Sequence, residues 1–148
     1  MNLPKEFAFY VERGVARKCS PDKPRAQFLV GESQNSIEGL REIIEKIGAN
    51  EKNANSIVKD CYDIIMELIR ARMLIDGFNA SGQYAHESEV SYLQKLGFPD
   101  NEVAFLNELG YFRNSITYYG KILDKEYAEK IVKFMNDVYP KLKKLIKV

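Results

Sequence analysis

The chain has 148 residues, of which 45% are hydrophobic and 29% are charged, so it is long enough to bury a core and too apolar to be disordered. Its 22 basic and 21 acidic residues leave a formal net charge of +1, which argues against a protein that coats nucleic acid or a membrane by bulk charge. No apolar run approaches the length of a membrane span, and residues 1–14 lack the basic and then apolar order of a secretory signal. We expect one cytoplasmic domain over residues 1–148.

Hydrophobic periodicity is helical along the chain, without strand-like alternation of convincing length. Residues 4–18 are expected to form a minor helix packed on the others. A long helix is predicted over residues 22–48, with Ser20 and Pro21 marking its start and Gly48 its end. Its inward positions recur at steps of three and four: Ala26, Val30, Ser33, Ile37, Leu40, Ile44 and Ile47.

A second long helix is predicted from Ala54 to Asp76, closed by Gly77. Asp76 is also a candidate acid for pairing with an arginine. The polar connection over residues 48–55 is short, which makes the two long helices antiparallel neighbours. The stripe of the second helix comprises Ala54, Ile57, Val58, Cys61, Ile64, Ile65, Leu68, Arg72 and Ile75.

Three further helices complete the predicted all-α, up-and-down bundle. Residues 85–96 form a shorter helix that ends at the sequence GFPD, and residues 100–119 form another that ends at Gly120. The last helix begins with Asp124 as its N-cap, and Pro140 is expected to kink it. Its inward stripe is Ala128, Ile131, Met135, Val138, Leu142 and Leu145.

The carboxyl-terminal helix is the basic part of the chain. Residues 121–148 carry eight lysines and four acids, a local charge of +4. One interpretation is a solvated outer face whose lysine stems shield apolar positions. The other is a surface that contacts phosphates. Cys19 and Cys61 have neither a CxxC spacing nor a histidine at ligand spacing, so we expect reduced thiols, with no metal and no cofactor.

Residues 110–121, GYFRNSITYYGK, place Arg113 on the inward face of their helix. It lies four residues after Leu109 and three before Ile116, and Asn114, Thr117 and Tyr118 fall to one side of it. A buried unpaired guanidinium is costly, so two alternatives are open. Either an acid or carbonyl elsewhere in the fold pairs with Arg113, or the arginine faces a cleft that holds an anion.

Two stretches together resemble a known family. Residues 74–98 read LIDGFNASGQYAHESEVSYLQKLGF, and residues 108–121 read ELGYFRNSITYYGK. Their order resembles the HEPN superfamily, the helical domains named for higher eukaryotes and prokaryotes nucleotide-binding. The resemblance covers about residues 50–147, while residues 1–49 resemble the amino-terminal helical extension of some prokaryotic members.

The family motif is an arginine, a polar residue, and a histidine after four to six intervening positions. Arg113 and Asn114 match its first two residues. The histidine is absent, since the three candidate positions hold Tyr118, Tyr119 and Gly120. The chain therefore resembles a prokaryotic subgroup that carries tyrosine in place of the motif histidine.

The resemblance implies a bundle of four main helices that forms a symmetric homodimer, with two copies of the motif lining a shared cleft. Many members are metal-independent endoribonucleases of toxin-antitoxin type, paired with a small nucleotidyltransferase. Others have lost activity and bind RNA, a nucleotide or a protein partner. The resemblance thus implies a ligand site formed by Arg113, Asn114, Thr117, Tyr118 and Tyr119.

Cleavage of RNA without a metal needs a general base, a general acid and a cation beside the phosphorus. Arg113 is the candidate cation, because its planar fork grips phosphate and stays charged. Asn114 is the candidate for orienting the phosphate. Tyr118 is a poor base at neutral pH, since a tyrosine titrates near a pKa of about 10 and an imidazole near about 6.5. Tyr118 is suited instead to hydrogen bonding and stacking.

His86 is the one histidine, and it begins the helix over residues 85–96. The family order brings this helix start toward the cleft, which makes His86 a candidate catalytic residue together with Arg113 and Tyr118. The alternative is a structural histidine that bonds a helix end or a neighbouring acid, such as Glu87 or Glu89. Similarly, the tyrosines beside Arg113 are either core and interface rings or platforms on which bases stack.

Three functions follow from these observations. The favoured one is a HEPN-like module that binds RNA, a nucleotide or a protein partner through the Arg113 and Asn114 cleft with little or no catalysis. The second is an active metal-independent endoribonuclease. The third is a helical protein-interaction domain with no role in nucleotide binding.

Overall fold

The computed structural model describes residues 2–119 and 124–148, except for the side chains of residues 116–119. Within this part of the chain, six helices form the all-α bundle that the sequence predicts. They are α1 (Phe7–Glu12), α2 (Lys23–Lys46), α3 (Ala54–Asp76), α4 (Ala85–Lys95), α5 (Asp100–Tyr119) and α6 (Lys125–Lys144). Two short strands, β1 (Ala16–Lys18) and β2 (Phe78–Ala80), accompany them. Over the described residues, no helix combines the length and the apolar character that crossing a membrane requires.

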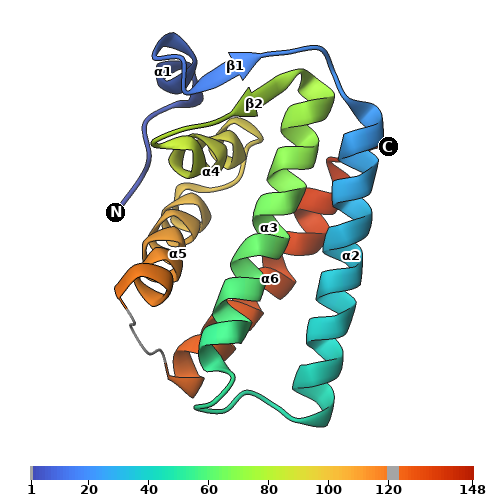
Figure 1. Ribbon diagram of the computed structural model, residues 1–148, viewed down its shortest axis with the longest axis vertical. Helices are drawn as coiled ribbons and strands as arrows, with labels where there is room; N and C mark the ends of the chain where they lie inside the picture. Colours follow the sequence, from blue (N-terminus) through green and yellow to red (C-terminus); the bar gives the residue numbers. More distant parts are fainter. Residues whose placement is uncertain (1, 120–123) are drawn as a thin grey trace.

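Helix α3 is the centre of the fold. As predicted, α2 runs antiparallel along one side of it; α6 crosses behind, and α4 and α5 lie on its other side (Figure 1). A helix surrounded in this way is apolar around most of its circumference. Its largest buried side chains are Ile57, Tyr62, Ile64, Ile65, Met66, Leu68, Ile69 and Met73.

Two long helices begin with an aspartate cap. The Asp22 side chain accepts a hydrogen bond from the backbone N–H three residues on, so α2 starts just after the predicted Ser20 and Pro21. Asp124 does the same for α6, and the predicted N-cap is confirmed. Each cap satisfies one of the four N–H groups that a helix start leaves without a partner.

Glycine ends both long helices that pack as antiparallel neighbours. Gly77 caps α3 with φ 82°, and a Cβ at this position would lie 2.8 Å from the carbonyl oxygen of Cys19. Gly48 follows α2 with φ 81°. Both conformations are left-handed and favour glycine, which is why the sequence marks these helix ends clearly.

The prediction of a minor helix over residues 4–18 was correct for its middle part and wrong in extent, because these residues form a helix of only six residues followed by a strand. Gly14, with φ 73°, turns the chain after α1. The chain then pairs β1 antiparallel with β2, with Ala16 opposite Ala80. The sequence shows no alternation here because strands of three residues are too short to express it.

The predicted stripes are correct in the middle of the helices and drift at the ends. In α2, Ala26, Ile37 and Leu40 are buried, whereas Ile47 is exposed. The prediction also drifts at the end of α6, where Ile146 is buried instead of the predicted Leu145. Helix ends have fewer neighbours, so periodicity alone does not decide burial there. Pro140 lies inside α6, and the kink stays a prediction.

Candidate functional site

A pocket of about 510 Å³ opens between α3, α5 and the start of α4. Tyr62 lines it from α3, and residues 82–84 and His86 line it from the start of α4. Helix α5 contributes Asn107, Gly110, Tyr111 and Asn114. The pocket therefore collects one part of the arginine-asparagine motif and the one histidine of the chain, which come from different helices.

Tyr62 forms the inner wall of the pocket. Its ring is fully buried, and its hydroxyl lies 3.5 Å from His86 Nδ1. Burial raises the pKa of this hydroxyl well above its usual value, and the charge of Glu89 acts in the same direction. The hydroxyl consequently stays protonated at neutral pH. It can donate a hydrogen bond, but it cannot serve as a base.

Gly110 allows α5 to approach Tyr62 closely. A Cβ at this position would lie 3.1 Å from the Tyr62 hydroxyl oxygen, a contact that would force one of the two groups to move. Neither Gly110 nor Tyr62 was predicted as a site residue. The one signal was a glycine inside a helical pattern, which often marks a close approach.

His86 lies in the first turn of α4 with an exposed side chain. Its ring centroid is 6.2 Å from that of Tyr62, at an interplanar angle of 39°. The structure brings His86 to the same pocket as Asn114, where the family order had suggested it. The alternative acid partner Glu89 instead binds Arg70, through contacts of 2.8 Å from Nε and 3.2 Å from Nη2.

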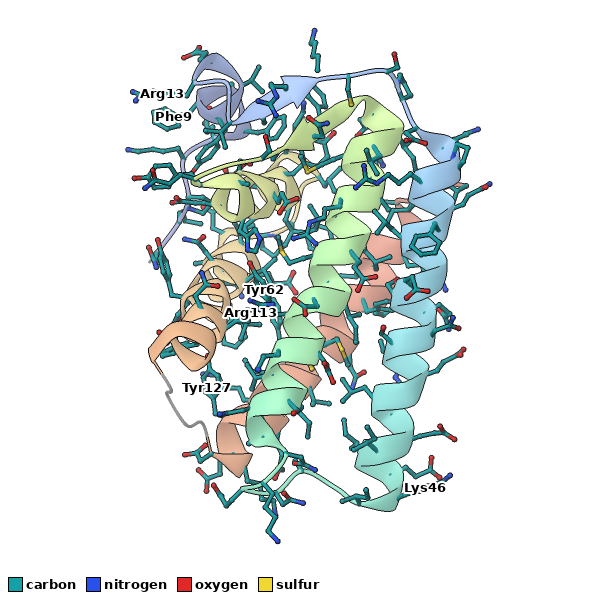
Figure 2. All side chains as sticks on the ribbon, viewed as in Figure 1. Phe9, Arg13, Lys46, Tyr62, Arg113 and Tyr127 are labelled. Carbon is teal, nitrogen blue, oxygen red and sulfur yellow. The ribbon has the colours of Figure 1, made fainter. Side chains whose placement is uncertain are left out.

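Arg113 lies beside this pocket, in the space between α3 and α5 where Figure 2 also labels Tyr62. Its Nε is 3.7 Å from Asp63 Oδ1, and the exposed fractions of the two side chains are 26% and 47%. An acid is therefore near Arg113, as the first alternative required. The contact is long and half open to water, so the second alternative is also compatible with it.

The remaining candidate residues lie at the end of α5. Thr117, Tyr118 and Tyr119 belong to its last turn, but their side chains lie outside the described residues, as does Gly120. Asp76, the candidate acid, accepts a hydrogen bond of 2.8 Å from Arg72 and another from the Tyr92 hydroxyl. The prediction that Asp76 meets an arginine is confirmed.

Two exposed tyrosines stand at the rim of the pocket. Tyr84 is 58% exposed and Tyr111 is 55% exposed, and both line the pocket. Tyr84 has φ 68°, which makes it the one residue other than glycine with positive φ among the described residues. Bulky residues rarely adopt this conformation, because it costs backbone energy.

The lysines of α6 were open to two interpretations. Lys141 pairs with Glu102 of α5 at 3.4 Å, and Lys143 donates a hydrogen bond to Gln34 of α2. Lys125 pairs with Glu129 within α6 itself. These contacts favour the interpretation as a solvated outer face.

Comparison of the chain with models of protein families, with curated proteins and with solved structures finds no match.

Proposed function

We propose that this chain is a HEPN-like module that binds RNA or a nucleotide through the cleft beside Arg113 and Asn114, with little or no catalysis. The observation that carries the proposal is that Asn114 and His86 line one pocket of about 510 Å³. The resemblance to the HEPN superfamily linked these two residues before any geometry was known. A pocket of this size suits a nucleotide unit.

Arg113 supplies the cation for a phosphate at the edge of this pocket. Its guanidinium offers a planar fork that binds phosphate through two hydrogen bonds. The contact of 3.7 Å with Asp63 is longer than a charge-assisted hydrogen bond, and the carboxylate is 47% exposed. A phosphate can therefore compete with Asp63 for the arginine.

The two tyrosines at and beside the motif favour binding over cleavage. The Tyr62 hydroxyl is kept protonated by burial, and Tyr118 occupies a position where the motif has histidine. His86 is the one imidazole in the chain, and its presence in the pocket is the observation that favours the second function, a metal-independent endoribonuclease. The test must therefore measure binding and cleavage separately.

The binding test measures fluorescence anisotropy of labelled single-stranded RNA in buffer with a chelator. We expect the unmodified protein to bind and Arg113→Gln to weaken binding by about tenfold or more. Arg41→Gln is the matched control, because Arg41 is an arginine of α2 that hydrogen-bonds to Asn136 of α6, away from the pocket. If neither RNA nor a nucleotide binds, the proposal is wrong, and the helical protein-interaction domain becomes the better hypothesis.

The cleavage test follows the same RNA on a denaturing gel. We expect no chelator-resistant cleavage by the unmodified protein, and a gain of cleavage in Tyr118→His that Arg113→Gln removes. Chelator-resistant cleavage by the unmodified protein, lost in His86→Ala, would establish the endoribonuclease instead.

The resemblance to the HEPN superfamily also implies a homodimer and a small nucleotidyltransferase partner. Sedimentation at roughly tens of micromolar protein tests the dimer, and a monomer there would count against it.

A further inference from the structure

The pocket contains groups that recognise a base rather than a phosphate. The described residues that line it include tyrosines, asparagines, a glutamine, one histidine and the acid Glu87, but no lysine or arginine. Phosphate contacts depend on cations, whereas bases are recognised by aromatic faces and by hydrogen bonds to their edges. We infer that this pocket binds an unpaired adenine base, while any phosphate lies outside it toward Arg113. This inference rests on the proposed function and specifies its ligand.

Stacking is the first contribution to this recognition. Tyr84 and Tyr111 are both more than half exposed, and they reach the rim of one pocket from two different helices. Exposed aromatic rings at a pocket offer faces on which an unpaired base stacks. A base within a duplex is already stacked and cannot insert between them. The ligand is therefore a nucleotide or a single-stranded segment.

The backbone of Tyr84 is a second, independent feature of this rim. Its φ of 68° is a conformation in which glycine or asparagine is far less strained. The chain nevertheless holds a tyrosine there, at the N-cap of α4, with its side chain at the pocket. Strained residues of this kind cluster at ligand sites, because the surrounding structure keeps them for their side chains.

The amides provide the discrimination between bases. Asn107 is buried, and its Nδ2 donates a hydrogen bond of 3.2 Å to the backbone oxygen of Asn2, which leaves Oδ1 as an acceptor. Asn114 adds a complete amide at the same pocket. An asparagine amide pairs through two hydrogen bonds with the amino group and ring nitrogen of adenine.

The other bases fit these groups less well. Guanine presents two acceptors on its comparable edge, which arginine or lysine reads, and neither residue is among the described lining residues. Glu87, a lining acid that could accept from the amino group of guanine or cytosine, lies against the Tyr10 hydroxyl instead. Cytosine and uracil also have a single ring and a smaller face for stacking. The Tyr62 hydroxyl, which lies 3.5 Å from His86 Nδ1, is a further donor at the inner wall.

The experiment titrates the protein with adenosine and with the monophosphates of adenosine, guanosine, cytidine and uridine, by calorimetry up to millimolar ligand. We expect adenosine to bind without a phosphate, because the base fills the pocket, and its monophosphate to bind about tenfold more tightly through the added contact with Arg113. Adenosine monophosphate should bind about tenfold or more tightly than the other three nucleotides. Raising the salt concentration should weaken adenosine binding little, since adenosine carries no phosphate.

Two variants with matched controls locate the site. Tyr111→Leu should weaken adenosine binding by about fivefold or more, whereas Phe28→Leu, which changes an exposed ring of α2, should not. Asn114→Ala should remove the preference for adenine over guanine, whereas Asn101→Ala, at the exposed start of α5, should keep it. Circular dichroism checks that each variant is folded.

The possible failures are distinguishable. Equal binding of all four monophosphates, or binding that requires the phosphate and is insensitive to Tyr111→Leu, overturns the adenine inference and leaves the proposed function intact. The same holds if single-stranded RNA binds but adenosine does not at millimolar concentration. Loss of all RNA and nucleotide binding in the unmodified protein overturns both.

Discussion

Two arginine-carboxylate pairs join helix α3 to a neighbouring helix, and they differ in how completely their carboxylates are buried. Arg70 donates two hydrogen bonds to Glu89 of α4, at 2.8 Å and 3.2 Å, and the Glu89 side chain is only 6% exposed. Arg113 of α5 approaches Asp63 to 3.7 Å, and the Asp63 side chain is 47% exposed. The first pair has the geometry of a fixed internal contact, whereas the second is longer and joins a largely buried arginine to a half-exposed carboxylate.

The difference shows which of the two arginines its carboxylate holds more firmly. A buried carboxylate that has lost its water needs its arginine, so the Arg70 pair is committed to holding α4 against α3. The exposed Asp63 keeps much of its water and loses little when its partner turns to another anion. We therefore expect the Arg70 pair to serve stability, and the Arg113 pair is the one that we propose for binding.

The largest expected effect is on the Arg70 pair. Arg70→Met should lower the free energy of unfolding by about 3 to 5 kcal/mol, because it leaves the Glu89 carboxylate buried without its cation. Urea denaturation measures this change. Lys46→Met is the control, since Lys46 and Glu42 form a fully solvated pair at 3.6 Å on α2. Similar midpoints for the two variants would show that the Arg70 pair is no more structural than a surface pair.

The next largest effect is a loss of stability at high pH that comes from Cys61, a buried residue of α3. Burial, aided by the charge of Asp60, raises the pKa of the Cys61 thiol to about 12 from an ordinary value of 9.0. The folded chain then keeps a proton that the unfolded chain loses, so stability present below pH 9 falls as pH rises toward 12. The loss is on the order of 2 to 4 kcal/mol.

Urea unfolding at successive pH values from 8 to 11 measures that loss. In Cys61→Ala the decline between pH 9 and 10 should be shallower, because the buried thiol no longer contributes to it. Above pH 10 a decline should persist in both proteins, since burial also raises the pKa of Tyr10 to about 12. Identical slopes below pH 10 would contradict the assignment to Cys61.

Substitutions in the Arg113–Asp63 pair should change RNA binding more than they change stability. Arg113→Gln and Asp63→Asn should each change the free energy of unfolding by less than about 1 kcal/mol. Their effects on RNA binding should have opposite signs: Arg113→Gln weakens it, and Asp63→Asn strengthens it by a few-fold, because the carboxylate no longer competes with phosphate. Severe destabilisation by both variants would mean that Arg113 is a structural residue.

The sequence predicts the helices and their buried core well, and the surroundings of the Arg113 pair less well. The stripes of α2, α3 and α6 are regular, so periodicity alone located these helices and most of their core. The Arg70 pair was missed because its two residues lie on different helices. Local patterning does not report which distant groups meet.

The candidate site was half visible in the sequence. The arginine-asparagine motif pointed to Asn114, and the family order pointed to His86, which reach the same pocket. Tyr84 and Asn107 were not foreseen, because a polar residue near a helix start and an asparagine inside a helix have ordinary structural explanations. The positive φ of Tyr84 is a backbone property that its residue type argues against.

The smallest expected effect tests whether the strained backbone of Tyr84 is kept for ligand binding. Tyr84→Gly relieves the left-handed backbone at φ 68°, so it should raise the free energy of unfolding by about 0.5 to 1 kcal/mol while it weakens adenosine binding. Gly82 is the matched control, since it lies in the same turn with φ 79° and open space around its Cβ position. Gly82→Ala should lower stability by a similar amount, because alanine is strained there. Thermal melts and calorimetry on the two variants separate the effects. If Tyr84→Gly is less stable than the unmodified protein, the ring contributes more to the fold than its backbone costs, and Tyr84 is a structural residue rather than one kept for the ligand.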